Sequence, residues 1–229
     1  MAEKTYPYVA GCNWLPVLLL GGLLALAGCG RDAGSAGGEE PFDLLRLASG
    51  GEPYEGTGHY PADPWACVLD RKTGLAWEVK TVSDGLHAAS NTYTWYSPDP
   101  DLSERERGTP DGGECAGGDC DISAYVEAVN ERGLCGFSDW RLPERGELAT
   151  LNDPRIDPPG PTLATAYFPN TRPDGYWSGS AYGLHYTGAW LWDFGYGFDR
   201  VDWKSNKHHV RLVRGRLDPR RREPPDDRR

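Results

Sequence analysis

The spacing of apolar residues predicts two helices in the middle of the chain. Residues 121–132 form the clearer one, since their apolar positions recur at i, i+3, i+4 and i+7: Ile122, Tyr125, Val126 and Val129. Asp121 is suited to cap the start of this helix, and Gly133 its end. A second, shorter helix is expected over residues 143–151, with Pro143 in its first turn.

Strand patterns lie on both sides of these helices. Residues 67–78 read as two strands joined by a turn in which Gly74 supplies a positive φ. Alternation or β-rich composition predicts further strands at 92–96, 175–180, 189–194 and 209–214. The order strands, helix, helix, strands predicts an α+β fold.

The remaining segments divide the chain into parts. Residues 61–216 are expected to form the folded domain, with a long acidic loop at 97–120. Residues 29–60 are rich in Gly, Glu, Pro and Ser, which predicts a flexible tether with one short helix over the apolar cluster at 42–47. Residues 217–229 are Pro-, Arg- and Asp-rich, so a basic disordered tail is expected.

A short apolar run near the start indicates export. Residues 15–27 are too short, and too broken by Pro and Gly, to span a bilayer comfortably, but they fit the central region of a secretory signal. The run ends in Leu26-Ala27-Gly28-Cys29, which resembles the end of a bacterial lipoprotein signal peptide. The resemblance implies that residues 1–28 are removed and that Cys29 carries a lipid anchor. The alternative is an ordinary signal peptide cut near Ala27.

Charge is distributed unevenly along the chain. The net charge is −10, but residues 204–229 hold ten basic and four acidic residues, so this end carries +6 and the rest −16. A nucleic-acid-binding protein has its basic face on the fold itself, so no nucleic-acid partner is expected. The part after residue 28 is also rich in Trp and Tyr, which is typical of sugar- or partner-binding domains.

Four cysteines follow Cys29, namely Cys67, Cys115, Cys120 and Cys135. An even number in an exported protein predicts two disulfides, for which three connectivities are possible. We favour Cys115–Cys120, which closes a small loop, and Cys67–Cys135, which ties the first strand to the end of the first helix. A zinc site is the competing interpretation, but the chain has no Cys-x-x-Cys pair.

The order of motifs resembles that of the Lcl C-terminal domain family. These motifs are TGLAWE at 73–78, GLCGFSDWRLP at 133–143, Glu147-Leu148, FPNT at 168–171, YWS at 176–178, WLWDF at 190–194 and VRLVR at 210–214. The resemblance covers about residues 65–215 and implies a C-type lectin-like α+β fold. The best-known member is an adhesin that binds sulfated polysaccharides. This chain lacks that member's collagen-like repeats, so the resemblance does not automatically imply trimerisation and adhesion.

Several motif residues are expected to stabilise the fold. In the run Asp139-Trp140-Arg141, the Trp would lie in the core and Arg141 would pair with a buried carboxylate, either Glu147 or Asp193. A ligand-binding role for Arg141 is the alternative. Trp177, Trp190 and Trp192 are expected in the core rather than as sugar platforms, because they occupy alternating strand positions.

Ligand-binding residues are instead expected in exposed loops between the last strands. The candidates are Tyr182, His185, Tyr186, Tyr196, Trp203, Lys204 and Lys207. Aromatic rings stack on sugars, and Lys suits sulfate or phosphate. A polar hairpin edge without a ligand is the alternative. Calcium is a further hypothesis at Asp111, Glu114 and Asp119, against a simple solvated acidic loop.

These observations favour a non-catalytic binding protein. The chain has no Gly-x-Ser-x-Gly, no His-Glu-x-x-His and no phosphate-binding loop. We expect a membrane-anchored envelope lipoprotein with a lectin-like domain for a polyanionic or envelope polysaccharide. The alternative is an assembly lipoprotein that docks on an envelope protein complex. Gly30 rather than Asp follows Cys29, which favours the outer membrane or cell surface, while the sequence leaves the oligomeric state open.

Overall fold

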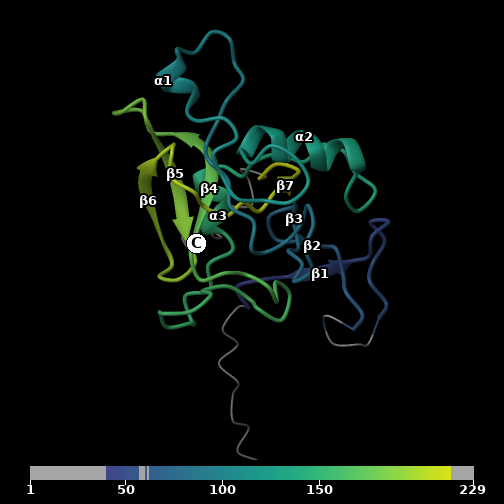
Figure 1. Cartoon of the computed structure of the whole chain (residues 1–229). Coiled ribbons are helices and arrows are strands. Elements are labelled where there is room, and N and C mark those ends of the chain that lie inside the picture. Colours follow the sequence, from purple (N-terminus) through teal and green to yellow (C-terminus); the bar gives the residue numbers. More distant parts are fainter. Residues whose placement is uncertain (1–39, 57–59, 61, 218–229) are drawn as a thin grey trace, which may run out of the picture. The chain divides into compact units, whose positions relative to one another are not determined.

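Two antiparallel sheets, one of four strands and one of three, form the framework of this α+β protein (Figure 1). The computed structural model describes residues 40–56, 60 and 62–217. The predicted signal segment, Cys29 and the tail from residue 218 onward lie outside the described residues. Within the described part, three short helices accompany the sheets.

The four-stranded sheet has the order β1-β2-β3-β7. Strands β2 (Cys67–Asp70) and β3 (Leu75–Glu78) form the predicted hairpin. Its turn is held by Asp70, whose carboxylate accepts hydrogen bonds from Lys72 N at 2.9 Å and Thr73 Oγ1 at 2.7 Å. Gly74 has the predicted positive φ, at 78°. The short strand β7 (Val213–Arg214) pairs with β3.

The helix expected at 42–47 is wrong, because this segment contains strand β1 (Leu44–Leu47). β1 pairs with β2 along its whole length and covers what would otherwise be an unpaired sheet edge. Local apolar spacing over four residues does not distinguish a helix from a strand, so this long-range pairing decided the outcome. The folded part therefore begins before residue 61, inside the segment predicted to be a tether.

The central helix is confirmed as α2 (Ile122–Arg132). Asp121 caps it, accepting from Ser123 N at 2.9 Å and Ala124 N at 3.0 Å. The second predicted helix is shorter than expected: α3 (Arg145–Ala149) is preceded by Glu144 as its N-cap, so Pro143 lies outside it. A further short helix, α1 (Glu104–Arg107), lies inside the predicted long loop.

The three-stranded sheet confirms two predicted strands and adds one. β4 (Gly175–Ala181) and β5 (Gly188–Asp193) lie where alternation predicted them, and β5 also pairs with β6 (Phe198–Trp203). β6 was missed because its charged and apolar residues do not alternate strictly, with Asp199 and Arg200 adjacent, and because it has no fully buried position. The strand predicted at 92–96 forms only isolated bridges, since its residues pair with four different segments.

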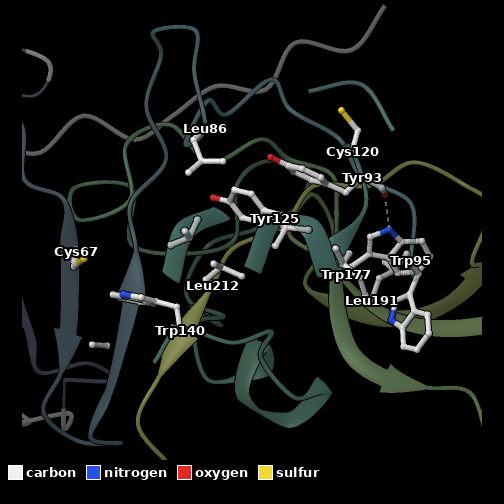
Figure 2. Packing of buried hydrophobic residues seen from close by; sticks show 14 of the residues in the cluster. Cys67, Leu86, Tyr93, Trp95, Cys120, Tyr125, Trp140, Trp177, Leu191 and Leu212 are labelled. Carbon is white, nitrogen blue, oxygen red and sulfur yellow. Dashed lines mark hydrogen bonds between the residues drawn. The ribbon is translucent and has the colours of Figure 1, made fainter. Parts of the chain in front are cut away.

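The core is built around large aromatic side chains (Figure 2). Trp177 of β4 is fully buried, as predicted, and its indole donates to the Tyr93 carbonyl at 2.8 Å. Trp140 is buried as well and donates to the Leu134 carbonyl at 3.0 Å. Both favoured disulfides, Cys67–Cys135 and Cys115–Cys120, are confirmed.

A buried carboxylate, that of Glu78 at the end of β3, organises the polar interior. It accepts hydrogen bonds from Lys80 Nζ at 2.8 Å, Leu212 N at 3.0 Å and the Tyr125 hydroxyl, and it lies 2.9 Å from His87 Nδ1. Burial raises the pKa of the Glu78 carboxyl, but Lys80 and His87 outweigh it and hold the pKa well below its usual range. Glu78 therefore remains ionised inside the protein.

A fully buried arginine, Arg211, extends this network. Its guanidinium donates to the Glu78 carbonyl and to Thr171 Oγ1, the latter at 2.7 Å. It also lies over the Phe168 ring, 4.8 Å from the centroid. The Glu78 network thus joins β3, α2, the 168–171 segment and the chain just before β7.

Glu78→Gln is expected to lower the free energy of unfolding by about 3–5 kcal/mol, because the buried Lys80 ammonium loses its counter-charge. The matched variant Glu78→Gln/Lys80→Met removes both charges and should recover part of that loss. Urea unfolding monitored by tryptophan fluorescence measures both. Equal losses in the two variants would show that the charge pair is not the cause.

The two disulfides should differ in their effect on stability. Cys67–Cys135 spans 68 residues and Cys115–Cys120 only 5, so loop entropy predicts losses of about 4 and about 2 kcal/mol when each pair is replaced by Ser. Thermal unfolding of the two double-serine variants compares them. A larger loss for the 115–120 pair would contradict this ranking.

Candidate functional site

Four of the predicted ligand residues lie together at one end of the three-stranded sheet. Tyr182, His185 and Tyr186 belong to the β4–β5 hairpin, and Trp203 ends β6; we call these four residues the hairpin patch. His185 stacks on Tyr186 at 5.2 Å between ring centroids and meets the Trp203 ring edge-on at 5.3 Å. The Trp203 side chain is 54% exposed, so a large ring faces solvent.

Backbone pairing positions the hairpin patch. Trp203 is the register partner of Gly188, and Gly188 exchanges hydrogen bonds with the hairpin through Tyr182 N and the His185 carbonyl, both at 3.0 Å. From α1, Arg105 donates to the Tyr186 hydroxyl at 3.2 Å. The rings are therefore held by two strands and a helix rather than by the hairpin alone.

Three cavities surround the hairpin. One of about 310 Å³ is lined by Tyr182, His185, Gly188, Val201, Asp202 and Trp203. A second of about 370 Å³ shares Tyr182 with it and is also lined by Tyr186, Trp95 and Glu106. A third of about 310 Å³ shares Trp203 with the first and lies against Arg105. A ligand bound at the hairpin patch would therefore lie next to cavities on several sides of the hairpin.

Asp202 stabilises the backbone next to the hairpin patch. One carboxylate oxygen accepts from Trp203 N and Asn206 Nδ2, both at 2.8 Å, and the other from Arg200 Nη1 at 3.1 Å and His208 Nε2 at 2.8 Å. These four bonds use the acceptor capacity of the carboxylate. Asp202 therefore fixes the backbone at Trp203 and does not serve as an acceptor for a ligand.

His208 is the buried partner of Asp202. Its ring lies edge-on to Trp177, with 4.7 Å between centroids. Burial lowers the pKa of His208, and the hydrogen bond to Asp202 only partly opposes this effect. The neighbouring His209 points elsewhere, with its Nδ1 2.8 Å from the Asn91 carbonyl, so the two rings do not form a metal site.

The other three predicted ligand residues do not join the patch. Lys204 was expected to be exposed but is buried: its ammonium lies over the Trp95 ring, 4.1 Å from the centroid, and donates to the Glu106 carbonyl. Lys207 pairs with Glu114 at 2.7 Å. Tyr196 lies at the opposite end of the sheet, in the β5–β6 turn. The lysines thus serve packing and pairing rather than a free anion site.

The predicted calcium ligands do not converge. Asp111 accepts from Cys120 N at 2.8 Å, Glu114 binds Lys207, and Asp119 is exposed. Within residues 40–56, 60 and 62–217, no three His, Cys, Asp or Glu side chains are grouped so that they could hold a metal ion. Asp111 instead holds the loop at the start of α2, since its backbone N donates to the carboxylate of Asp121, which caps the helix.

The motif residues at 139–141 have structural partners. Of the two carboxylates predicted for Arg141, Glu147 is the one it binds, with two bonds of 2.7 Å. Asp193 instead accepts from Gly195 N at 2.9 Å. Asp139 binds Arg214 at 2.7 Å and so fastens its loop to β7. These contacts indicate that residues 139–141 stabilise the fold of the domain.

Trp190 and Trp192 are only half-buried, unlike Trp177. Trp190 is covered from α3 by the Arg145 guanidinium, 3.8 Å from its ring centroid, and meets Tyr182 edge-on at 5.4 Å. It therefore backs the hairpin patch from the side of α3. Its face is not open for a sugar.

Two residues that shape the site, Asp202 and Arg105, were missed. Asp202 lies in the missed strand β6, where the available signal was the aromatic and β-branched residues Phe198, Val201 and Trp203. Arg105 reaches Tyr186 across 81 residues of sequence, and no local pattern indicates that contact.

Comparison with known proteins identifies the family. The family model of the Lcl C-terminal domain matches residues 66–214, about two thirds of the chain. The chain therefore belongs to the Lcl C-terminal domain family. No curated protein and no solved structure matches the chain. The C-type lectin-like character of the fold stays a prediction. Among the described residues, no helix has the length and apolar character needed to cross a membrane.

Acidification is expected to destabilise the domain through His208 and His209. Burial lowers the pKa of both rings below the ordinary 6.5, so the unfolded chain takes up protons more readily than the folded one. Their contribution to stability is present above about pH 6.5 and is lost as the pH falls below it. The free energy of unfolding between about pH 7 and 5 should therefore fall less steeply in His208→Gln/His209→Gln.

The control for this measurement is Val82→Ser, which changes an exposed side chain without a titratable group and should keep the wild-type slope. A double variant with the same slope as the wild type would contradict the assignment to the buried pair.

Proposed function

We propose that this protein is a lipid-anchored envelope protein whose Lcl C-terminal domain binds a glycan at the hairpin patch without chemical conversion. The observation that carries the proposal is Trp203, a large ring more than half exposed and held in place by β5 pairing and by Asp202. Flat aromatic faces presented rigidly beside a cavity suit the apolar faces of sugar rings.

The charges around the patch favour a neutral or weakly charged glycan over a densely sulfated one. The cavities carry three acidic side chains, Glu104, Glu106 and Asp202, against Arg105 and Lys204. The Lys204 ammonium is turned inward to the Glu106 carbonyl, and Arg105 is bound to Tyr186. Because Asp202 is paired with Arg200, a polyanion would find no excess of positive charge in these cavities.

The anchor comes from the sequence motif that ends at Cys29. Lipidation there would hold the domain at a membrane, with ten residues between Cys29 and Glu40, the first described residue. We place it at the outer membrane or cell surface, where an envelope polysaccharide is within reach.

Docking on an envelope protein is the second candidate, and one observation favours it. Leu184, at the tip of the hairpin, is 85% exposed and extends the aromatic patch with an apolar side chain. A protein partner would bury Leu184, whereas a sugar stacked on Trp203 would not need it.

Trp203→Ala is expected to weaken glycan binding by roughly tenfold or more, since it removes the exposed stacking surface. The test is an array of neutral and sulfated envelope polysaccharides probed with the full chain, with and without a calcium chelator. We expect binding to neutral glycans that is unaffected by the chelator.

Two matched variants sharpen this test. Lys207→Ala removes an exposed cation outside the patch and should leave glycan binding unchanged. Leu184→Ser should also bind glycans normally. Loss of binding to an envelope protein in Leu184→Ser, with no glycan bound by the wild type, would instead support the docking function.

A further inference from the structure

A second pair of exposed aromatic side chains lies at the other end of the three-stranded sheet. Tyr196 is 59% and Phe198 49% exposed, and their ring centroids are 6.1 Å apart; we call them the turn pair. Phe198 begins β6 and Trp203 ends it, so the turn pair and the hairpin patch are separated by the length of a strand, about 17 Å.

The first described residue of the chain contacts a loop that is hydrogen-bonded to the β5–β6 turn. Glu40, the first described residue, pairs with Arg155 at 3.0 Å. The loop that begins beside Arg155 is bonded to the turn through Gly160 N to the Gly195 carbonyl at 3.1 Å and Thr162 N to the Phe194 carbonyl at 2.8 Å. The segment that leads back to Cys29 therefore starts close to the turn pair.

The C-terminal side leaves the domain near the same place. The Arg216 carbonyl lies against Gly74 of the β2–β3 turn, and Lys72 of that turn donates to the Glu40 carbonyl. Three arginines, Arg220 to Arg222, begin three residues after Leu217, the last described residue.

We propose that this end of the domain, with the turn pair at its tip, rests on the anionic lipid surface to which Cys29 is anchored. The inference depends on the lipid anchor of the proposed function. Ten intervening residues allow a span of at most about 40 Å, so the anchor keeps the turn pair at a high local concentration near lipid.

The chemistry of the surface fits this occupant. Tyr and Phe rings partition into the interfacial region of bilayers, and arginines near the surface are attracted to anionic head groups. In this orientation β6 points the hairpin patch away from the membrane, toward its glycan.

The test uses the full-length lipidated protein in nanodiscs that contain phosphatidylglycerol, with Cys29→Ser protein in solution as reference. Hydrogen exchange by mass spectrometry should show slower exchange at residues 194–198 on the nanodisc, by roughly threefold or more, and unchanged exchange at residues 182–187. Nanodiscs of phosphatidylcholine alone should give weaker protection, because the arginines lose their anionic partner.

The variant Tyr196→Ser/Phe198→Ser should remain anchored and keep glycan binding while losing this protection. Equal exchange on and off the nanodisc, or protection at 182–187 instead, would overturn the inference. Failure of the wild type to associate with lipid would remove the anchor and this inference together. Glycan binding lost in Trp203→Ala would still stand as a separate result, so the two failures are distinguishable.

Discussion

The buried carboxylate of Glu78 is the interaction on which the rest of this structure depends. It joins a strand of the first sheet to α2 through Tyr125 and to the end of the domain through the Leu212 amide. Burying a carboxylate without partners would cost more free energy than the rest of the fold contributes to stability. Lys80 and the surrounding donors must therefore be present together. Arg211 extends the network to Thr171, whose hydroxyl oxygen accepts a hydrogen bond from the guanidinium. The Glu78 carboxylate thereby links the first third of the domain to the last third.

This arrangement explains what membership of the Lcl C-terminal domain family implies. The motif residues Glu78, Thr171 and Arg211 form the buried network, and Arg141 binds Glu147 beside it. None of these five residues lines the three cavities around the hairpin. These motif residues of the chain therefore stabilise the fold, while the four residues of the hairpin patch lie outside the motifs. A ligand known for one member cannot be transferred to this chain on the strength of the motifs alone.

Local signals in the sequence predicted the elements whose causes are local. The cap at Asp121, the turn at Gly74 and the helical spacing of α2 each act within a few residues, and all three are found. β1 and β6 depend on pairing with distant strands, which no short window contains. The same holds for the site. Exposed aromatics were predicted from loop positions, but the burial of Lys204 follows from the Trp95 ring, 109 residues earlier in the chain.

The second sheet gives the two aromatic surfaces a fixed relation. β5 and β6 run between them with continuous pairing from Gly188 and Trp203 at one end to Asp193 and Phe198 at the other. A paired sheet packed on a core does not bend freely, so the distance between the two surfaces is fixed. A contact that orients one end necessarily orients the other. Weak affinity of the turn pair for lipid is then sufficient to orient the domain, because the covalent anchor already holds it near the membrane. The strands fix the hairpin patch at the opposite end of the sheet, so that it faces away from the membrane.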